Sequence, residues 1–286
     1  MMEKFRIDGK KKIKIKDFST NDTGTFKNKE KALVKLGENI EIISELQNKL
    51  YADNTYSILI IFQAMDAAGK DGTMKHVFSG INPQGFQIFN FKQPSVEELD
   101  HSYLWRTAKS MPERGRIGVF NRSYYEDVLV VKVHNLLAAQ NLPKSRMYKD
   151  IWDKRYHHIR EQERYLYENG IIPIKFFLNV SKEVQKERFL ERIEDPTKNW
   201  KFSAADVAER KFWDDYQNAY EDAINNTSTE YAPWHIIPAD KKWFTKFAVS
   251  EIIKNTLEDL KLKYPEVNKN QKSELKKYKE TLLKEK

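Results

Sequence analysis

Two carboxylates and a lysine lie close together in the segment at 63–73, which reads QAMDAAGKDGT. The segment follows an apolar, β-branched run and precedes a helical pattern, so we expect a turn between a strand and a helix. Its small residues let backbone N–H groups approach phosphate oxygens, the helix start adds partial positive charge, and Lys70 supplies a mobile cation. The sequence therefore predicts a phosphate-binding loop that contains Ala67, Ala68, Gly69, Lys70, Asp71, Gly72 and Thr73.

The two carboxylates of this segment, Asp66 and Asp71, oppose phosphate binding unless a cation lies between them and the phosphate. Magnesium is commonly held by one or two carboxylates together with phosphate oxygens. We therefore predict that Asp66 positions Mg²⁺, with Mn²⁺ as a possible substitute. The alternative is an ordinary turn with a helix-capping aspartate. The common phosphate-loop pattern has glycine where Ala64 stands and serine or threonine where Asp71 stands.

A second group of candidate residues follows another apolar run, in the segment NRSYYED at 121–127. An arginine at a strand's carboxyl end, beside a phosphate-binding loop, can pair with a phosphoryl group through two hydrogen bonds, which is the role predicted for Arg122. Glu126 and Asp127 are candidates for orienting water or metal, and Asp127 is the second predicted metal ligand. Taken alone, Arg122 is equally compatible with a surface ion pair.

Short apolar runs alternate with longer helical patterns along the chain. The runs, predicted to be strands, lie at 56–62, 86–91, 116–120, 172–180 and 234–238. The helical patterns lie at 29–53, 69–80, 95–110, 124–139, 145–169, 181–194, 203–226 and 241–262. This alternation predicts an α/β fold with a doubly wound parallel sheet. Ligands of such sheets bind beyond the carboxyl ends of the strands, where both candidate segments lie.

The segment from Ser181 to Asn225 is rich in charge and is longer than one crossover helix between two strands requires. We predict a helical lid at about 181–225 with its tip at 194–202, because lids of this kind close over phosphates in kinases. An inert helical insertion is the alternative. Residues 1–30 mix charges with turn formers and predict a basic arm laid over a domain at 31–262, and residues 263–286 predict a charged tail.

Composition narrows the classes of function. The 286 residues suit one large domain, since single cores stop growing at roughly 250–300 residues. The absence of cysteine excludes disulfides, thiolate metal sites and cysteine nucleophiles. The net charge of +8 favours polyanionic partners. No run approaches the roughly 18 apolar residues of a membrane-spanning helix, so we expect a cytoplasmic protein without a membrane partner.

Four ordered blocks of the chain resemble the signature blocks of the polyphosphate kinase 2 family. They read QAMDAAGKDGTMKHVFSGINPQGFQ, PSVEELDHSYLWR, FNRSYYEDVLV and RFLERIEDPTKNWKFSAADVAERKFWDDY. The resemblance implies a three-layer P-loop kinase fold with a helical lid. It also implies Mg²⁺-dependent, reversible phosphoryl transfer between inorganic polyphosphate and AMP or ADP, with GMP and GDP as further candidates, in a homodimer or homotetramer. The family usually has aspartate where Asn121 stands, and asparagine resembles the class that phosphorylates both nucleoside mono- and diphosphates.

The resemblance also assigns residues to roles. Asp66, Lys70, Asn121 and Arg122 are the predicted catalytic group, although asparagine at 121 cannot carry the charge of the usual acid. Lid cations are expected to contact the transferred group, and the candidates are Arg188, Arg192, Lys198 and Lys201. A basic channel for long polyphosphate is predicted from Lys75, His76, Lys92, Arg106, Lys109 and Arg116.

Two other functions fit part of the pattern. An ATP-dependent nucleoside monophosphate kinase of the thymidylate kinase type shares the loop, the strand-end arginine and the lid, but takes its phosphoryl group from ATP. A basic nucleic-acid-binding protein with a degenerate loop fits the net charge. Such binders usually show a defined module or aromatic residues interleaved in a basic groove, and neither is evident, so we expect no nucleic-acid partner.

Overall fold

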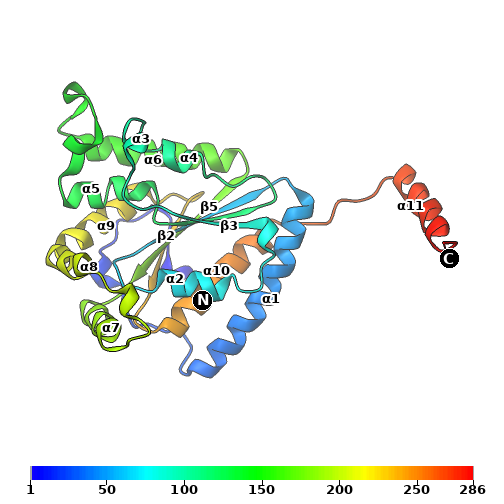
Figure 1. Ribbon diagram of the computed structural model, residues 1–286, viewed down its shortest axis with the longest axis horizontal. Coiled ribbons are helices and arrows are strands. Elements are labelled where there is room, and N and C mark those ends of the chain that lie inside the picture. The colour runs from blue at the N-terminus through cyan, green and yellow to red at the C-terminus, as the bar shows by residue number, and fades with distance from the viewer. Residues whose placement is uncertain (1, 286) are drawn as a thin grey trace.

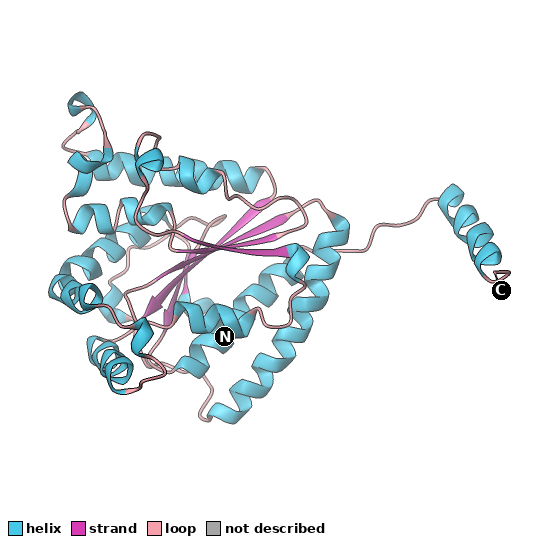
Figure 2. Cartoon of the chain, viewed as in Figure 1, coloured by secondary structure: helices cyan, strands magenta, loops and turns pink. Residues whose placement is uncertain are grey.

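A six-stranded sheet forms the centre of the computed structural model, which describes residues 2–285 (Figure 2). Its order is β1-β6-β5-β2-β4-β3. The strands are β1 Arg6–Ile7, β2 Ser57–Gln63, β3 Phe86–Asn90, β4 Ile117–Asn121, β5 Ile171–Asn179 and β6 Trp234–Pro238. All neighbouring pairs are parallel except β1 and β6. The α/β class and the parallel core of the sheet are confirmed, and β1 makes the complete sheet mixed.

Strand β2 lies at the middle of the sheet and determines where the site forms. Every residue of β2 is buried, as expected for an apolar strand covered on both faces. In register, Phe62 lies opposite Asn121 of β4 on one side and Phe176 of β5 on the other. The carboxyl ends of β2 and β4 therefore meet at one edge of the sheet, which brings the two candidate segments together.

Helices cover both faces of the sheet. On one face, α1 Lys29–Asp53 packs along α10 Lys242–Asp259, which also contacts α2 Lys70–Val77 (Figure 1). On the other face, α6 Ile151–Glu168 packs against α9 Trp213–Thr227 and β5, and α5 Val130–Val133 contacts α9. This arrangement has the three layers expected. Of the helices formed by residues 2–285, none is long and apolar enough to cross a membrane.

Two of the predicted long helices are wrong, because each is divided into short, separate elements. The pattern at 95–110 forms only α3 Val96–Leu99 and α4 Trp105–Ala108, although Ser95 and Glu98 form the expected capping box. The pattern at 124–139 forms a 3₁₀ turn, then α5, then a second 3₁₀ turn. Left-handed backbone at Asn135 (φ 53°) separates the last two, and the β-branched residues of α5 have low helix propensity.

The predicted lid region divides into two parts. Helix α7 Lys182–Glu194 leads to the tip, and the short helix α8 Ala204–Glu209 follows it (Figure 1). Helix α9 packs on α5 and α6 and so belongs to the helical layer of the sheet. The projecting lid is therefore shorter than the 181–225 predicted, because the aromatic and small residues of α9 are buried: Tyr216, Ala219, Tyr220, Ala223 and Ile224.

The two ends of the chain differ in their contacts. The segment predicted to be an arm contributes strand β1 and the buried side chains of Met2, Phe5 and Ile15 to the core, so it extends the domain. In contrast, α11 Lys269–Leu282 has no buried residue and stands apart from the body in Figure 1. Helix α11 lies within residues 263–286, the segment predicted to be a charged tail.

Candidate active site

The loop between β2 and α2 turns sharply through two left-handed residues. Ala67 has φ 60° and Gly69 has φ 105°, and only glycine adopts the second value without strain. Gly69 is the N-cap of α2, and the first N–H groups of a helix have no intrahelical acceptor. Lys70 Nζ donates to the Ala64 carbonyl at 2.9 Å, and burial lowers the pKa of Lys70. The loop therefore presents free N–H donors beside a lysine.

Asp66 and Arg122 join the two candidate segments directly. Arg122 Nη2 donates to Asp66 Oδ1 at 3.0 Å, and its Nη1 lies 3.9 Å from Glu126 Oε2. The backbone of Arg122 is left-handed (φ 63°), and its N–H donates to the Phe62 carbonyl at 3.0 Å. Glu126 and Asp66 raise the pKa of Arg122 despite its partial burial, so the guanidinium is charged at any working pH.

Asn121 links the loop to the neighbouring strand. Its Nδ2 donates to Asp71 Oδ1 at 3.0 Å and to Asn90 Oδ1 at 2.8 Å. Asn90 lies directly opposite Asn121 in the β3–β4 register. Asn121 Oδ1 is buried and, among residues 2–285, has no hydrogen-bond partner. Because a buried oxygen without a donor is costly, this atom is a candidate ligand for a cation or a bound water.

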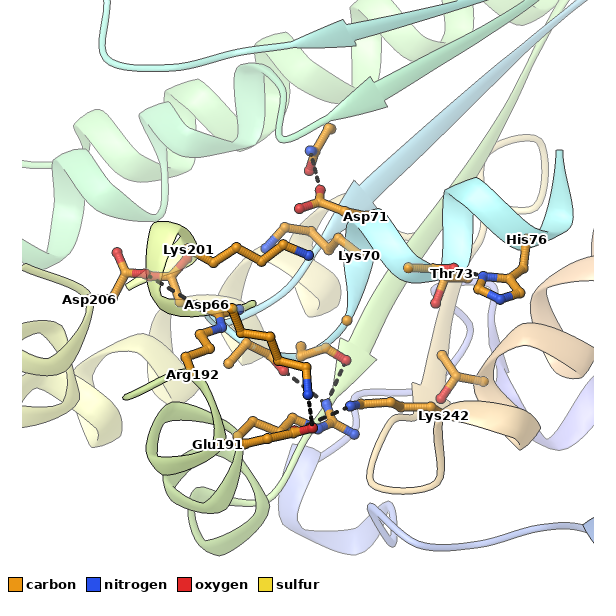
Figure 3. A pocket seen from close by; sticks show the side chains of 18 of the residues that line it. Asp66, Lys70, Asp71, Thr73, His76, Glu191, Arg192, Lys201, Asp206 and Lys242 are labelled. Atoms are coloured by element: carbon orange, nitrogen blue, oxygen red, sulfur yellow. Dashed lines mark hydrogen bonds and ion pairs between the residues drawn. The ribbon is translucent and has the colours of Figure 1, made fainter. Parts of the chain in front are cut away.

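Four predicted lid cations have different environments. Arg192 Nη1 lies 3.6 Å from Asp206 Oδ2, and Lys198 Nζ pairs with Glu191 at 2.7 Å and Asp195 at 2.6 Å. Lys201 lies at the tip. These three side chains line a cavity over the loop, and Figure 3 shows Arg192 and Lys201 there together with Lys70 and Asp66.

Arg188, the fourth lid cation, is hydrogen-bonded to the backbone of the phosphate-binding loop. Its Nη1 donates to the carbonyls of Ala67 and Ala68, both at 2.9 Å, and its Nη2 donates to those of Ala239 and Asp240. The side chain is only 8% exposed. With these donors engaged by the backbone, Arg188 holds the loop against the turn before α10 and is not a mobile lid cation.

Two cavities of similar size meet at the Asp66–Arg122 pair, and both contain Asp66, Arg122 and Asp206. The first, of about 590 Å³, is lined by eight lysine and arginine side chains and four carboxylates; we call it the cation-rich cavity (Figure 3). The second, of about 580 Å³, is lined by one arginine and four carboxylates, together with Met65, Val130, Leu136, Tyr216 and Tyr220; we call it the acidic cavity.

Asp127, predicted as a metal ligand, lies away from both cavities. Its carboxylate accepts a hydrogen bond from Gln140 Nε2 and lies 4.0 Å from Arg155 Nη1. Burial raises the pKa of Asp127 to about 6. The prediction is wrong because Asp127 points into the α5–α6 layer, whereas its neighbour Glu126 lines the acidic cavity. Within residues 2–285 no group of three or more metal-binding side chains is present.

Of the six residues predicted to form a polyphosphate channel, His76 lines the cation-rich cavity and the other five do not. Arg106 is buried, pairs with Glu98 at 3.4 Å and donates to the Lys92 carbonyl. Arg116 precedes β4, at the opposite end of the strand from Asn121. Lys109 Nζ stacks 3.3 Å from the centre of the Trp105 ring. Lys75 and Lys92 line neither the cation-rich nor the acidic cavity.

Sequence reasoning missed several lining residues. Lys242 and Lys246 stand on the first turns of α10 and line the cation-rich cavity. Glu209, Tyr216 and His134 line the acidic cavity, where Tyr216 Oη donates to Glu209 at 2.8 Å. A signal for the two lysines was available, because α10 follows the carboxyl end of β6 and so begins at the edge of the sheet where ligands bind.

Comparisons with known proteins agree on one family. The family model of polyphosphate kinase 2 matches residues 26–265. The chain is 49% identical to the ADP-polyphosphate phosphotransferase of Rhodopseudomonas palustris over 99% of this chain and 98% of that one. It is 45% identical to the AMP/ADP-polyphosphate phosphotransferase of Meiothermus ruber, over 93% and 96%.

A solved structure supports the same assignment. The crystal structure of polyphosphate kinase 2 from Arthrobacter aurescens TC1 matches with a TM-score of 0.88 at 37% identity, covering 97% of this chain and 96% of that one. Fold, loop and sequence thus agree, and the chain belongs to the polyphosphate kinase 2 family.

Proposed function

We propose that the chain transfers a phosphoryl group reversibly between inorganic polyphosphate and adenine nucleotides, with the transfer at the Asp66–Arg122 pair. The observation that carries this proposal is the opposite charge of the two cavities that meet there. A reaction between a uniform polyanion and a nucleoside phosphate requires a cationic region for the polyanion and a second, less cationic region for the nucleoside. Two relatives named for ADP and for AMP and ADP support the choice of substrates.

Polyphosphate fits the cation-rich cavity. Its eight lysine and arginine side chains come from the loop, the end of β4, the lid and α10, so a chain of phosphates there would meet cations from several elements. Lys70 and the free N–H groups of the loop bind the phosphate next to the transferred one. The lid cations Arg192, Lys198 and Lys201 neutralise the chain beyond it, because each additional phosphate brings a further negative charge.

The nucleoside fits the acidic cavity. Its four carboxylates face one arginine, so the cavity would repel a polyphosphate chain, whereas Glu209 and the hydroxyl of Tyr216 offer hydrogen bonds to a sugar or base. Tyr220, Leu136 and Met65 add apolar wall for a base. The nucleotide's own phosphates then reach Arg122 at the junction, where the guanidinium can pair with them through two hydrogen bonds.

The residues at the junction fit a magnesium ion. Asp66 supplies a carboxylate, and Asn121 Oδ1 is a buried oxygen that lacks a hydrogen-bond donor in the described chain. Mg²⁺ takes oxygen ligands and is usually bound by only one or two carboxylates plus phosphates and waters, so a larger protein cluster is not required. When bound, the ion neutralises charge on the phosphoryl oxygens. Asp71 accepts a hydrogen bond from Asn121 Nδ2, which fixes the orientation of the Asn121 side chain and thus of Oδ1.

Two finer expectations belong to this proposal. Both AMP and ADP are acceptors, and GMP and GDP are further candidates, since the acidic cavity has polar groups but no described contact that selects one base. We also propose a cytoplasmic homodimer or homotetramer, on the strength of the family resemblance alone. The thymidylate kinase type of reaction, with ATP as donor, is not supported by the relatives' names.

A product assay tests the proposal. Purified protein given ADP, long-chain polyphosphate and Mg²⁺, with no other nucleotide, is expected to form ATP, and chelation of the divalent ion is expected to stop it. AMP and GDP are offered in parallel reactions to define the acceptors. The absence of ATP under these conditions, together with phosphorylation of a nucleoside monophosphate by ATP, would favour the thymidylate kinase type of reaction instead.

A further inference from the structure

A third cavity extends the cation-rich cavity away from the reaction centre. This distal cavity, of about 790 Å³, lies between the start of α1, α7 and the start of α10. The two cavities have five lining residues in common: His76, Arg188, Glu191, Lys242 and Lys246. The two cavities therefore adjoin, and the side chains at their boundary are mainly cationic.

The charges of the distal cavity favour an anion. Among its lysines, Lys29, Lys241 and Lys246 form no ion pair within residues 2–285. Lys242 has a distant partner, Glu191, at 3.8 Å, and that carboxylate also binds Lys198. Unpaired cations gathered in one cavity repel one another, and a bound polyanion removes that repulsion.

Three carboxylates, from Glu187, Glu191 and Asp240, face the distal cavity against four lysines and Arg188, so they offset its positive charge only in part. Both oxygens of Asp240 are already engaged: Thr20 Oγ1 donates to one at 2.6 Å and the Ser181 N–H donates to the other at 2.8 Å. Glu187, from α7, is exposed to solvent. Burial and the neighbouring charges of Lys242 and Lys29 lower the pKa of Lys246, in agreement with a crowded group of cations.

We infer that the distal cavity is a second polyphosphate subsite, which binds the part of a long chain that lies farthest from the transferred phosphoryl group. The inference rests on the proposed function and adds to it a basis for chain-length preference. Short chains fill only the cation-rich cavity, whereas long chains also reach Lys29 and Lys241. The enzyme then binds long polyphosphate more tightly than short polyphosphate, although the reacting groups are the same.

Lys29 provides the sharpest test because it lines the distal cavity but not the cation-rich cavity. It is the first residue of α1 and is exposed, so Lys29→Ala leaves the core and the Asn28 cap unchanged. We expect kcat/KM for long-chain polyphosphate to fall about tenfold, the loss typical of one hydrogen bond to a charged group. With the shortest polyphosphate that the wild-type enzyme turns over, kcat/KM is expected to stay unchanged.

Lys35→Ala is the matched control. It removes one charge from an exposed lysine of the same helix that lines neither the cation-rich nor the distal cavity, and it should leave both values unchanged. Calorimetric titration of long-chain polyphosphate, without nucleotide, should show the same weakening for Lys29→Ala only. An equal loss with short and long chains, no loss with either, or a loss confined to the KM for ADP would overturn the distal subsite. Failure of the wild-type enzyme to use any polyphosphate would instead refute the proposed function, and the subsite with it.

Discussion

Asp66→Asn is expected to lower kcat for ATP formation from ADP and polyphosphate by on the order of a thousandfold, as the loss of a preorganised charge at a transferred group typically does. The substitution keeps the size of the side chain and removes only its charge. Arg122 thereby loses the negative charge of its closest partner, at 3.0 Å, and the proposed ion loses its carboxylate. Steady-state assays across a range of Mg²⁺ concentrations measure the effect.

The folded structure of this variant should persist. The Asp66–Arg122 pair is partly exposed, and such pairs contribute about 0–1 kcal/mol to the free energy of unfolding. Asp153→Asn, on the exposed side of α6, removes one carboxylate elsewhere and serves as the control. If Asp66→Asn retains more than about a tenth of wild-type kcat, equivalent to roughly 1.4 kcal/mol, Asp66 does not have the role assigned to it.

Arg122→Ala is expected to reduce kcat by roughly 10³-fold or more, the range found when an arginine that neutralises a transferred phosphoryl group is removed. Within residues 2–285, Arg122 is the one lysine or arginine that lines both the cation-rich and the acidic cavity. Arg122 stays protonated, because Glu126 and Asp66 raise its pKa. Measurement of kcat with ADP and long-chain polyphosphate, both saturating, gives the loss.

Arg122→Lys separates charge from geometry at this position. Lysine and alanine meet the same left-handed backbone (φ 63°), so a difference between the two variants comes from the side chain. Lysine restores charge without the planar fork of donors and should recover only part of the activity. Arg114→Ala, which removes an exposed arginine that donates to the Thr55 carbonyl, is the control. Full activity of Arg122→Ala would show that Arg122 is only a surface ion pair.

The loop and the strand-end arginine were predictable because their positions follow from local pattern. A fully apolar strand followed by small residues and lysine specifies a strand, a tight turn and a helix start within one short segment. The meeting of Asp66 and Arg122 followed from a general property of parallel sheets, whose carboxyl ends share one edge. The register of β2 and β4 then places Phe62 opposite Asn121.

The channel was not predictable in the same way, because it depends on which helices meet in space. Arg106 reads as a free cation in the sequence, but tertiary packing buries it against Lys92 and Glu98. Lys29 is the opposite case: it lies far from the loop in sequence, at the start of α1, but lines a cavity next to the site. It reaches the site region only because α1 packs along α10.

The roles of Glu126 and Asp127 could not be separated from the sequence. Both were candidates for orienting water or metal because they lie in the first turn after the strand that ends near Arg122. The segment is a 3₁₀ turn, in which Ser123 accepts a hydrogen bond from the Tyr125 N–H. Tyr124 and Tyr125 are buried, Glu126 faces Arg122, and Asp127 turns towards Arg155.

A crystal structure with Mg²⁺, ADP and a non-hydrolysable polyphosphate analogue tests the central claim most directly. We predict the phosphate chain in the cation-rich cavity over Lys70, the nucleoside in the acidic cavity beside Tyr216, and an ion in contact with Asp66. A loop without phosphate, a site without an ion near Asp66, or a nucleoside in the cation-rich cavity would contradict the account.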